Sequence, residues 1–388
     1  MFAVLRNRRK ALTTIAALAG AFMLSACDPI GGGGSVTPGA PVAVALILPG
    51  GSGNPGDDVL ARNLRQAAEM AIADLDGVKI DLRVYNAGSD TGSNATVARR
   101  AVDEGAKIIL GPVFAQSANA VGVAVAQSGV NVLSFSNNTE IAGGNVFVLG
   151  HTFENTANRL VSYAARQGKG RMMVVHDNNT AGQLGLSAIR SAAARSGASV
   201  VGTATYEFSQ QGVVNAVPQI VSSVRANAAD SMVFTADTAG ALPLLAQLLP
   251  EAGISNTSVQ YIGLTRWDIP QATLAMPGVQ NGWFAMPDPG LTAQFQSRFL
   301  ATYGEGPHPI AGLAYDGIAA IGALVKQGNA DALSASALTQ GAGFAGVTGV
   351  FRLRSDGTNQ RGLAVAQIQN SQVVVIDPAP RSFGGAGF

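Results

Sequence analysis

The sequence predicts an α/β protein made of two doubly wound, Rossmann-like lobes joined by a hinge. Short apolar runs alternate with amphipathic helical stretches from residue 42 to residue 263, as in parallel sheets buried on both faces. The alternation breaks at residues 290–303 and ends in a hairpin-like region at residues 349–376. A closed eight-stranded barrel would continue the alternation, so two open sheets fit the pattern better.

The first 26 residues are predicted to be a lipoprotein signal peptide. Four basic residues at positions 6–10 precede an apolar stretch at 11–24, which is short for a membrane-spanning helix. The motif LSAC that ends at Cys27 resembles the bacterial lipobox, which implies cleavage before Cys27 and lipidation of its thiol. Cys27 is the only cysteine, so no disulfide forms within the chain. Residues 27–41, rich in Gly, Pro and Ser, are expected to be a flexible tether.

The composition and motifs favour a non-enzymatic protein. The formal net charge of +1 over 388 residues predicts no nucleic-acid partner, and contact with a membrane is expected through the lipid anchor only. The three histidines lack metal-ligand spacing, and no G-x-S-x-G nucleophile motif occurs. The glycine-rich residues 49–58 lack the lysine of a phosphate-binding loop. We therefore expect no cofactor and no metal.

The folded body is predicted to begin at residue 42, with strands placed by apolar runs and helices by apolar spacing and capping residues. The first series is strand 42–48, helix 59–75, strand 79–86, helix 89–104 capped by Ser93 or Asn94, strand 107–110, helix 117–128, strand 130–135 and apolar segment 146–149. The second series is helix 155–167, strand 171–175, helix 183–196, strand 200–206, helix 213–227, strand 231–235, helix 240–249 and strand 259–263.

Small hydrogen-bonding residues follow the strands at 107–110 and 130–135. In doubly wound sheets, ligands bind in the crevice beyond the carboxyl ends of the strands. Ser117, Ser136 and Asn138 are able to hydrogen-bond a carboxylate or a sugar hydroxyl at that edge. These residues predict a binding cleft rather than a reaction centre.

Several segments, taken in order, carry a family resemblance. They are VAVALILPG, AVDEGAKIILGPV, VNVLSFSNN, RMMVVHDNNTAGQLG and the late RFLATYGEGPHPIAGLAYDGIAAIGAL. The ordered set resembles the type 1 periplasmic binding proteins of the leucine-binding group. The resemblance implies a leucine-binding-protein-like domain over residues 42–383. It places lobe 1 at about 42–150 and 290–345, and lobe 2 at about 151–289 and 346–383.

The resemblance also implies a small polar ligand in the cleft between the lobes. In amino-acid-binding members, hydroxyl residues hold the carboxylate, and an aromatic residue and an acid from the second lobe hold the ammonium. Here Ala181 stands where the family commonly has a tyrosine, and the acid is either Asp237 or Asp268. Trp267 is expected in the core or on the cleft wall, and Arg266 in a surface salt bridge or on a ligand anion. The candidate ligand contacts are Ser117, Ser136, Asn137, Asn138, Asn178, Thr180, Asp237, Arg266 and Trp267.

Two functions are compatible with this reading. IGLTRWDIP, GVQNGWFAMPDP and VTGVFRLRSDGTNQRGLAVAQI resemble the lipoproteins described as penicillin-binding-protein activators. That implies an envelope lipoprotein, anchored at Cys27 on the periplasmic side, that regulates peptidoglycan synthesis by contact with a peptidoglycan synthase. The alternative is the solute-binding component of an amino-acid or amide ABC importer, with a permease as partner. The sequence leaves the ligand, the choice of membrane and the oligomeric state open.

Overall fold

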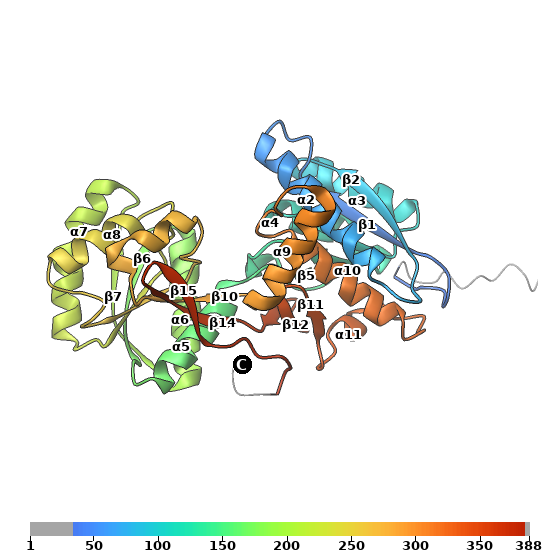
Figure 1. The fold of residues 1–388 in the computed structure, drawn as a ribbon. Coiled ribbons are helices and arrows are strands. Elements are labelled where there is room, and N and C mark those ends of the chain that lie inside the picture. The colour runs from blue at the N-terminus through green and yellow to red at the C-terminus, as the bar shows by residue number, and fades with distance from the viewer. Residues whose placement is uncertain (1–33, 385–388) are drawn as a thin grey trace, which may run out of the picture.

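The computed structural model describes residues 34–384, so the predicted signal peptide and Cys27 lie outside the described residues. The chain forms two lobes, each built around its own sheet with helices on both faces (Figure 1). This confirms the predicted α/β class. Within residues 34–384, no helix has both the length and the apolar character needed to cross a bilayer.

The first lobe contains a five-stranded parallel sheet with the strand order β2-β1-β3-β4-β5. Successive side chains of a strand point to opposite faces, so Leu46 joins the core under one helical layer and Ile47 the core under the other. The strands are β1 (Val42–Leu48), β2 (Ile80–Asn86), β3 (Ile108–Leu110), β4 (Asn131–Ser134) and β5 (Val146–Val148). Helices α2 (Pro55–Ala73), α9 (Pro289–Tyr303) and α10 (Gly312–Val325) cover one face, and α3 (Thr91–Asp103) and α4 (Ala115–Val125) the other.

The second lobe contains a seven-stranded sheet with the order β15-β14-β10-β9-β8-β6-β7. Strands β6 to β10 run parallel, and β14 and β15 add an antiparallel edge beside β10. The strands are β6 (Arg171–Asp177), β7 (Ser199–Tyr206), β8 (Ser231–Phe234), β9 (Gln260–Gly263), β10 (Trp283–Met286), β14 (Ala364–Gln369) and β15 (Gln372–Asp377). Helices α5 (Phe153–Arg166) and α6 (Thr180–Ser196) pack on one face, and α7 (Gln210–Ala226) and α8 (Leu242–Glu251) on the other.

The chain passes between the lobes three times, at residues 149–152, 287–288 and 362–363. A small antiparallel sheet of β11 (Phe344–Gly346), β12 (Gly349–Leu353) and β13 (Asn359–Arg361) precedes the third crossing, and the short helix α11 (Ala335–Leu338) comes before it. Phe351 and Leu353 are buried in the core of the first lobe. The expected lobe boundary at residue 346 was therefore too early, because a hairpin in the sequence does not reveal the surface on which it packs.

The predicted series differs from the structure at three further points. Residues 290–303, predicted as a break, form most of α9, because Pro289 occupies its first turn and Asp288 accepts the N–H groups of Gly290 and Leu291. Helix α3 is capped by Asp90, which accepts the Ser93 N–H at 2.7 Å, rather than by Ser93 or Asn94. Strand β10 was absent from the predicted series.

Candidate ligand-binding cleft

A cavity of about 390 Å³ lies between the two lobes beside the crossings. Its walls are mostly apolar and come from both lobes, with Val113, Phe135 and Ile310 from the first and Leu264, Ile269 and Met286 from the second. Six polar side chains interrupt these walls, namely Ser136, Asn137, His151, Thr156, Thr265 and Arg266. An apolar cavity with a few convergent polar groups is the usual form of a small-molecule site.

The sheet topology brings these polar residues together. Ser136 and Asn137 follow β4, and Thr265 and Arg266 follow β9, at the carboxyl ends of parallel strands in the two sheets. The first crossing lies against the loop after β4, where the Gly150 N–H donates to the Ser136 carbonyl at 3.0 Å. A Cβ at position 150 would lie 2.4 Å from that carbonyl oxygen, so only glycine permits this close approach.

The loop after β4 is held by its own hydrogen bonds. The Ser134 hydroxyl accepts the Ser136 N–H, and the Ser136 hydroxyl accepts the Asn138 N–H, both at 3.1 Å. Asn138 turns away from the cavity and caps the following turn, where its side chain accepts the Glu140 N–H. The backbone N–H of Asn137 makes no hydrogen bond within residues 34–384. This loop, which lines the cleft, therefore carries one N–H donor without a partner among the described residues and one hydroxyl.

Arg266 supplies the second lobe's donor. Its Nε and Nη2 atoms donate to the two carboxylate oxygens of Asp268, with Nε 2.6 Å from Oδ1. This bidentate pair fixes the plane of the guanidinium and leaves Nη1 without a partner among the described residues. The Arg266 side chain is 30% exposed and lines the cavity. Arg266 can therefore keep its salt bridge to Asp268 and also contact a ligand anion, the two roles that the sequence predicted as alternatives.

His151 is a cleft residue that sequence reasoning missed. It follows Gly150 in the first crossing, and its Nδ1 is buried without a hydrogen-bond partner. Burial, followed by the positive charges of Arg361 and Arg266, holds the pKa of His151 well below its ordinary value. The imidazole is therefore neutral at physiological pH. Its position just after a strand that ends at the predicted cleft edge was the only signal in the sequence.

Besides Asn138, five of the predicted contacts do not line the cavity. The buried Ser117 donates its hydroxyl to the Ser89 carbonyl at 3.2 Å. Trp267 has no exposed surface and lies in the second-lobe core, where its ring packs over Gly263 and Gly282. Asn178 donates its N–H to the Tyr206 carbonyl, Thr180 begins α6 on the surface, and the exposed Asp237 accepts the Gly240 N–H.

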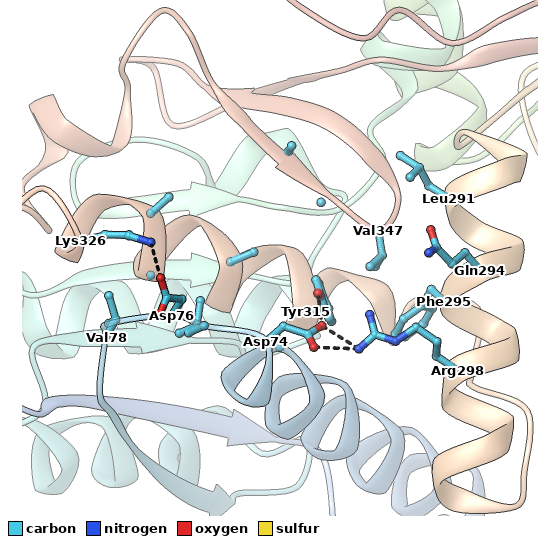
Figure 2. Close-up of a pocket in the computed structure, with 17 residues that line it drawn as sticks. Asp74, Asp76, Val78, Leu291, Gln294, Phe295, Arg298, Tyr315, Lys326 and Val347 are labelled. Atoms are coloured by element: carbon cyan, nitrogen blue, oxygen red, sulfur yellow. Dashed lines mark hydrogen bonds and ion pairs between the residues drawn. The ribbon is translucent and has the colours of Figure 1, made fainter.

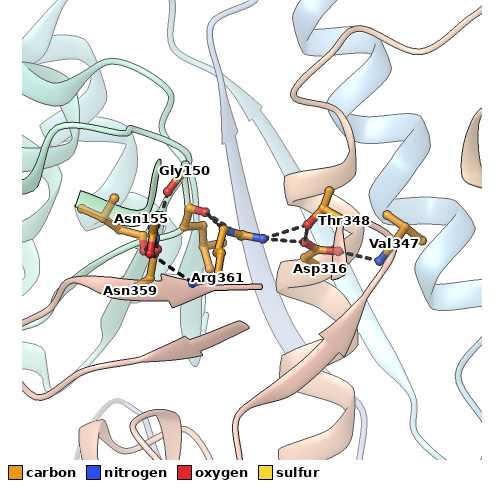
Figure 3. A network of polar contacts seen from close by, with 9 residues as sticks. Gly150, Asn155, Asp316, Val347, Thr348, Asn359 and Arg361 are labelled. Carbon is orange, nitrogen blue, oxygen red and sulfur yellow. Dashed lines mark hydrogen bonds and ion pairs between the residues drawn. The ribbon is translucent and has the colours of Figure 1, made fainter. Parts of the chain in front are cut away.

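A buried polar network ties the crossings to the first lobe (Figure 3). Arg361 of β13 pairs with Asp316 of α10 at 3.0 Å and also donates to the Leu149 carbonyl at 2.9 Å. Asn359 donates to the Gly150 carbonyl at 2.8 Å and accepts from the Asn155 side chain at 2.5 Å. The first and third crossings are thus joined to each other and to α10.

Two other hollows of comparable size each lie on a single lobe. One of about 530 Å³ lies between α2, α9 and α10, on the first lobe alone (Figure 2). Its charged side chains neutralise one another, since Arg298 pairs with Asp74 and Lys326 with Asp76. A hollow of about 670 Å³ lies along α8 on the second lobe and has a single acid, Glu251. Only the interlobe cavity combines both lobes with unpartnered donors among the described residues.

The sequence profile of the family described as periplasmic binding protein matches residues 41–372. The chain belongs to the periplasmic binding protein family. Membership implies a periplasmic location, and it confirms the resemblance to the type 1, leucine-binding group drawn from the sequence. No curated protein sequence matches the chain.

Solved structures of this periplasmic binding protein fold cover nearly the whole chain. A Rhodospirillum rubrum protein described as a branched-chain amino acid ABC transporter superposes with a TM-score of 0.74, at 17% identity over 87% of this chain and 100% of that one. A Desulfitobacterium hafniense ABC transporter substrate-binding protein in complex with Leu gives 0.65, at 18% identity over 87% and 100%. A Rhodopseudomonas palustris solute-binding protein in complex with 3,4-dihydroxybenzoic acid gives 0.60, at 15% identity over 88% and 97%.

These similar structures establish the fold of this chain. They do not identify its ligand. One of these periplasmic binding proteins holds an amino acid and another an aromatic acid, on the same fold. None of the three is described as an activator of penicillin-binding proteins, so that branch of the sequence prediction has no support from them. The transport alternative fits these relatives better.

Proposed function

We propose that the protein is the non-catalytic solute-binding component of an ABC importer, which delivers a small solute to a permease. The observation that carries the proposal is the pair of unpartnered donors on opposite walls of the cleft. The Asn137 N–H belongs to the first lobe and Arg266 Nη1 to the second. A solute that accepts from both would hold the lobes together, so occupancy would favour the closed form.

The direct test is a screen of the purified protein against amino acids, amides, organic acids, nucleosides, sugars and muropeptides. A solute that binds only the folded state, present at a concentration of a hundred times its Kd, adds about 2.7 kcal/mol to the free energy of unfolding. A thermal-shift assay detects a change of this size. We expect at least one small solute to raise the melting temperature and to reduce the radius of gyration in X-ray scattering. If no solute raised the melting temperature and the protein captured a peptidoglycan synthase, the activator role would be favoured instead.

A matched pair of serines tests whether the solute sits in this cleft. Ser136→Ala is expected to weaken the binding of the solute found in the screen about fivefold, since a hydrogen bond contributes about 1 kcal/mol. Ser117→Ala removes an equally buried hydroxyl that bonds only to Ser89, so the Kd should not change. Isothermal titration calorimetry on both variants decides the matter, and equal effects of the two substitutions would place the solute elsewhere.

We further propose that Cys27 anchors the domain through a lipid, with residues 28–41 as the tether. Within the described residues Val36 is buried in the first-lobe core and donates its N–H to the Ala330 carbonyl, so the predicted tether is packed against the first lobe at this point rather than flexible up to residue 41. Expressed in a bacterial envelope, the protein should partition into detergent, and Cys27→Ser should release it into the soluble fraction. Unchanged partitioning of the Cys27→Ser protein would contradict the anchor.

A further inference from the structure

The cleft offers charge of one sign only. Among its lining residues Arg266 is the single charged side chain, and no aspartate or glutamate of residues 34–384 lines it. His151 is the one other titratable side chain among the lining residues, and its pKa is lowered by burial and by the positive charges of Arg361 and Arg266. A ligand ammonium enclosed here would have no ionised partner, and an enclosed charge without a partner is costly.

The acids at the neighbouring strand ends are engaged in other contacts. Asp268 holds Arg266, and Asp177 accepts the Tyr206 hydroxyl. Asp237 accepts the Gly240 N–H at 2.6 Å. Glu207 follows β7, the edge strand farthest from the crossings in the sheet order, and Glu154 of α5 accepts the Thr139 hydroxyl. These five acids are thus turned to a local partner or distant in the sheet.

The residues that line the cavity do, in contrast, carry hydrogen-bond donors that no acceptor engages among the described residues. Arg266 Nη1 and the Asn137 N–H have no partners among the described residues. Ser136 adds a hydroxyl. Helix α4 begins two residues after Val113, a lining residue, and its N-cap residue Phe114 gives the first turn no side-chain partner. A carboxylate accepts several such donors at once, and a helix N-terminus favours negative charge near it.

The other lining residues limit how much negative charge the ligand carries. Apolar side chains from both lobes make up most of the walls, and a phosphate would bring two charges to a single guanidinium that already shares an aspartate. A sugar would place many hydroxyls against Phe135, Leu264 and Met286. One carboxylate on an apolar body matches both the donors and the walls.

We propose that the cleft binds an apolar organic monocarboxylate that carries no ammonium group, an aliphatic or aryl carboxylic acid rather than an α-amino acid. The carboxylate is held by Ser136 and the Asn137 N–H on one side and by Arg266 on the other, and the apolar body fills the remaining cavity. This inference rests on the proposed solute-binding function and specifies its ligand class.

Compounds that differ by one group test the inference. The Kd values of 4-methylpentanoate and 3-phenylpropanoate are measured by calorimetry on the purified full chain, beside L-leucine and L-phenylalanine, which add only the α-ammonium. 3-Phenylpropanamide serves as the uncharged counterpart. We expect at least one deaminated acid to bind at least tenfold more tightly than both its amino acid and the amide.

A variant pair places the carboxylate in the cleft. Arg266→Gln is combined with Asp268→Asn, so that no aspartate is left without its partner. Because a hydrogen bond to a charged group contributes about 1.5–3 kcal/mol, the double variant should bind the acid about ten- to a hundredfold more weakly and the amide unchanged. Asp237→Asn, which lies outside the cavity, should leave both Kd values unchanged.

The outcomes separate the two proposals. Tighter binding of L-leucine or L-phenylalanine, or binding of only a sugar, nucleoside or amide from the wider screen, would overturn the carboxylate inference and leave solute binding in place. Equal binding of acid and amide, or an acid whose Kd the double variant does not change, would also overturn it. Failure of every solute in the screen would overturn solute binding itself.

Discussion

Replacing Arg361 with methionine is expected to lower the free energy of unfolding by about 3–5 kcal/mol, the usual cost of leaving one member of a buried ion pair alone. Asp316 has no exposed surface, and the Arg361 side chain is only 2% exposed. The substitution leaves the carboxylate without a cation and the Leu149 carbonyl without a donor. Urea denaturation at pH 8 measures the loss.

The pH dependence of the stability of Arg361→Met tests whether the unpaired Asp316 carboxylate causes the loss. Burial raises the pKa of Asp316, and in the intact protein Arg361 opposes that effect. Without Arg361, the folded state favours the protonated form of Asp316. Proton binding by Asp316 therefore stabilises the folded variant at low pH, and this stabilisation is lost as the pH rises through the raised pKa of Asp316. The deficit of Arg361→Met should therefore be smaller at pH 5 than at pH 8.

A second substitution supplies the control. Asp316→Asn in the Arg361→Met chain removes the lone charge and keeps an acceptor for the Val347 N–H, which lies 2.8 Å from the Asp316 carboxylate. It should recover a large part of the lost stability and abolish the difference between pH 5 and pH 8. A deficit that is the same at both pH values and insensitive to Asp316→Asn would assign the loss to packing alone.

Trp267→Ala is expected to cost about 3–5 kcal/mol, as for other large side chains removed from a core. The ring has no exposed surface and fills a space that a Cβ at Gly263 or Gly282 would enter, at 2.3 and 2.4 Å from ring atoms. Its Nε1 is buried without a partner, so the ring stabilises the lobe by packing. Chemical denaturation compares the variant with Phe208→Ala, whose side chain is 67% exposed and should cost far less.

Ligand affinity separates a core role from a role on the cleft wall. If Trp267 only packs the second lobe, the folded fraction of Trp267→Ala should bind the solute with a Kd within about threefold of the unsubstituted protein at low temperature. Loss of binding without loss of stability would return Trp267 to the ligand contacts predicted from the sequence.

The hinge network has a consequence for how the lobes move. Arg361 and Asn359 hold the first and third crossings together through the Leu149 and Gly150 carbonyls. Asp316 fixes that pair to α10 of the first lobe. We therefore expect the bending on ligand binding to occur on the second-lobe side of these residues, because breaking a buried, satisfied network is costly.

The sequence by itself determined the fold class and the edge at which the cleft lies. The apolar runs and helical spacing report which segments are buried, and β1 has the predicted bounds, Val42–Leu48. The order of strands and helices predicts two open sheets, and in such sheets the loops at the carboxyl ends of strands form the site. Ser136, Asn137 and Arg266 were found in this way, and all three line the cavity.

Only the tertiary structure decided what each buried residue packs against. Arg266 and Trp267 are neighbours in the chain, yet one lines the cleft and the other lies in the core. Arg361 meets Asp316 across 45 positions, and Asn359 meets Gly150 across 209. Local periodicity reports whether a side chain is buried. Contacts between residues far apart in the chain follow from how the sheets and crossings meet in space, and no local pattern records them.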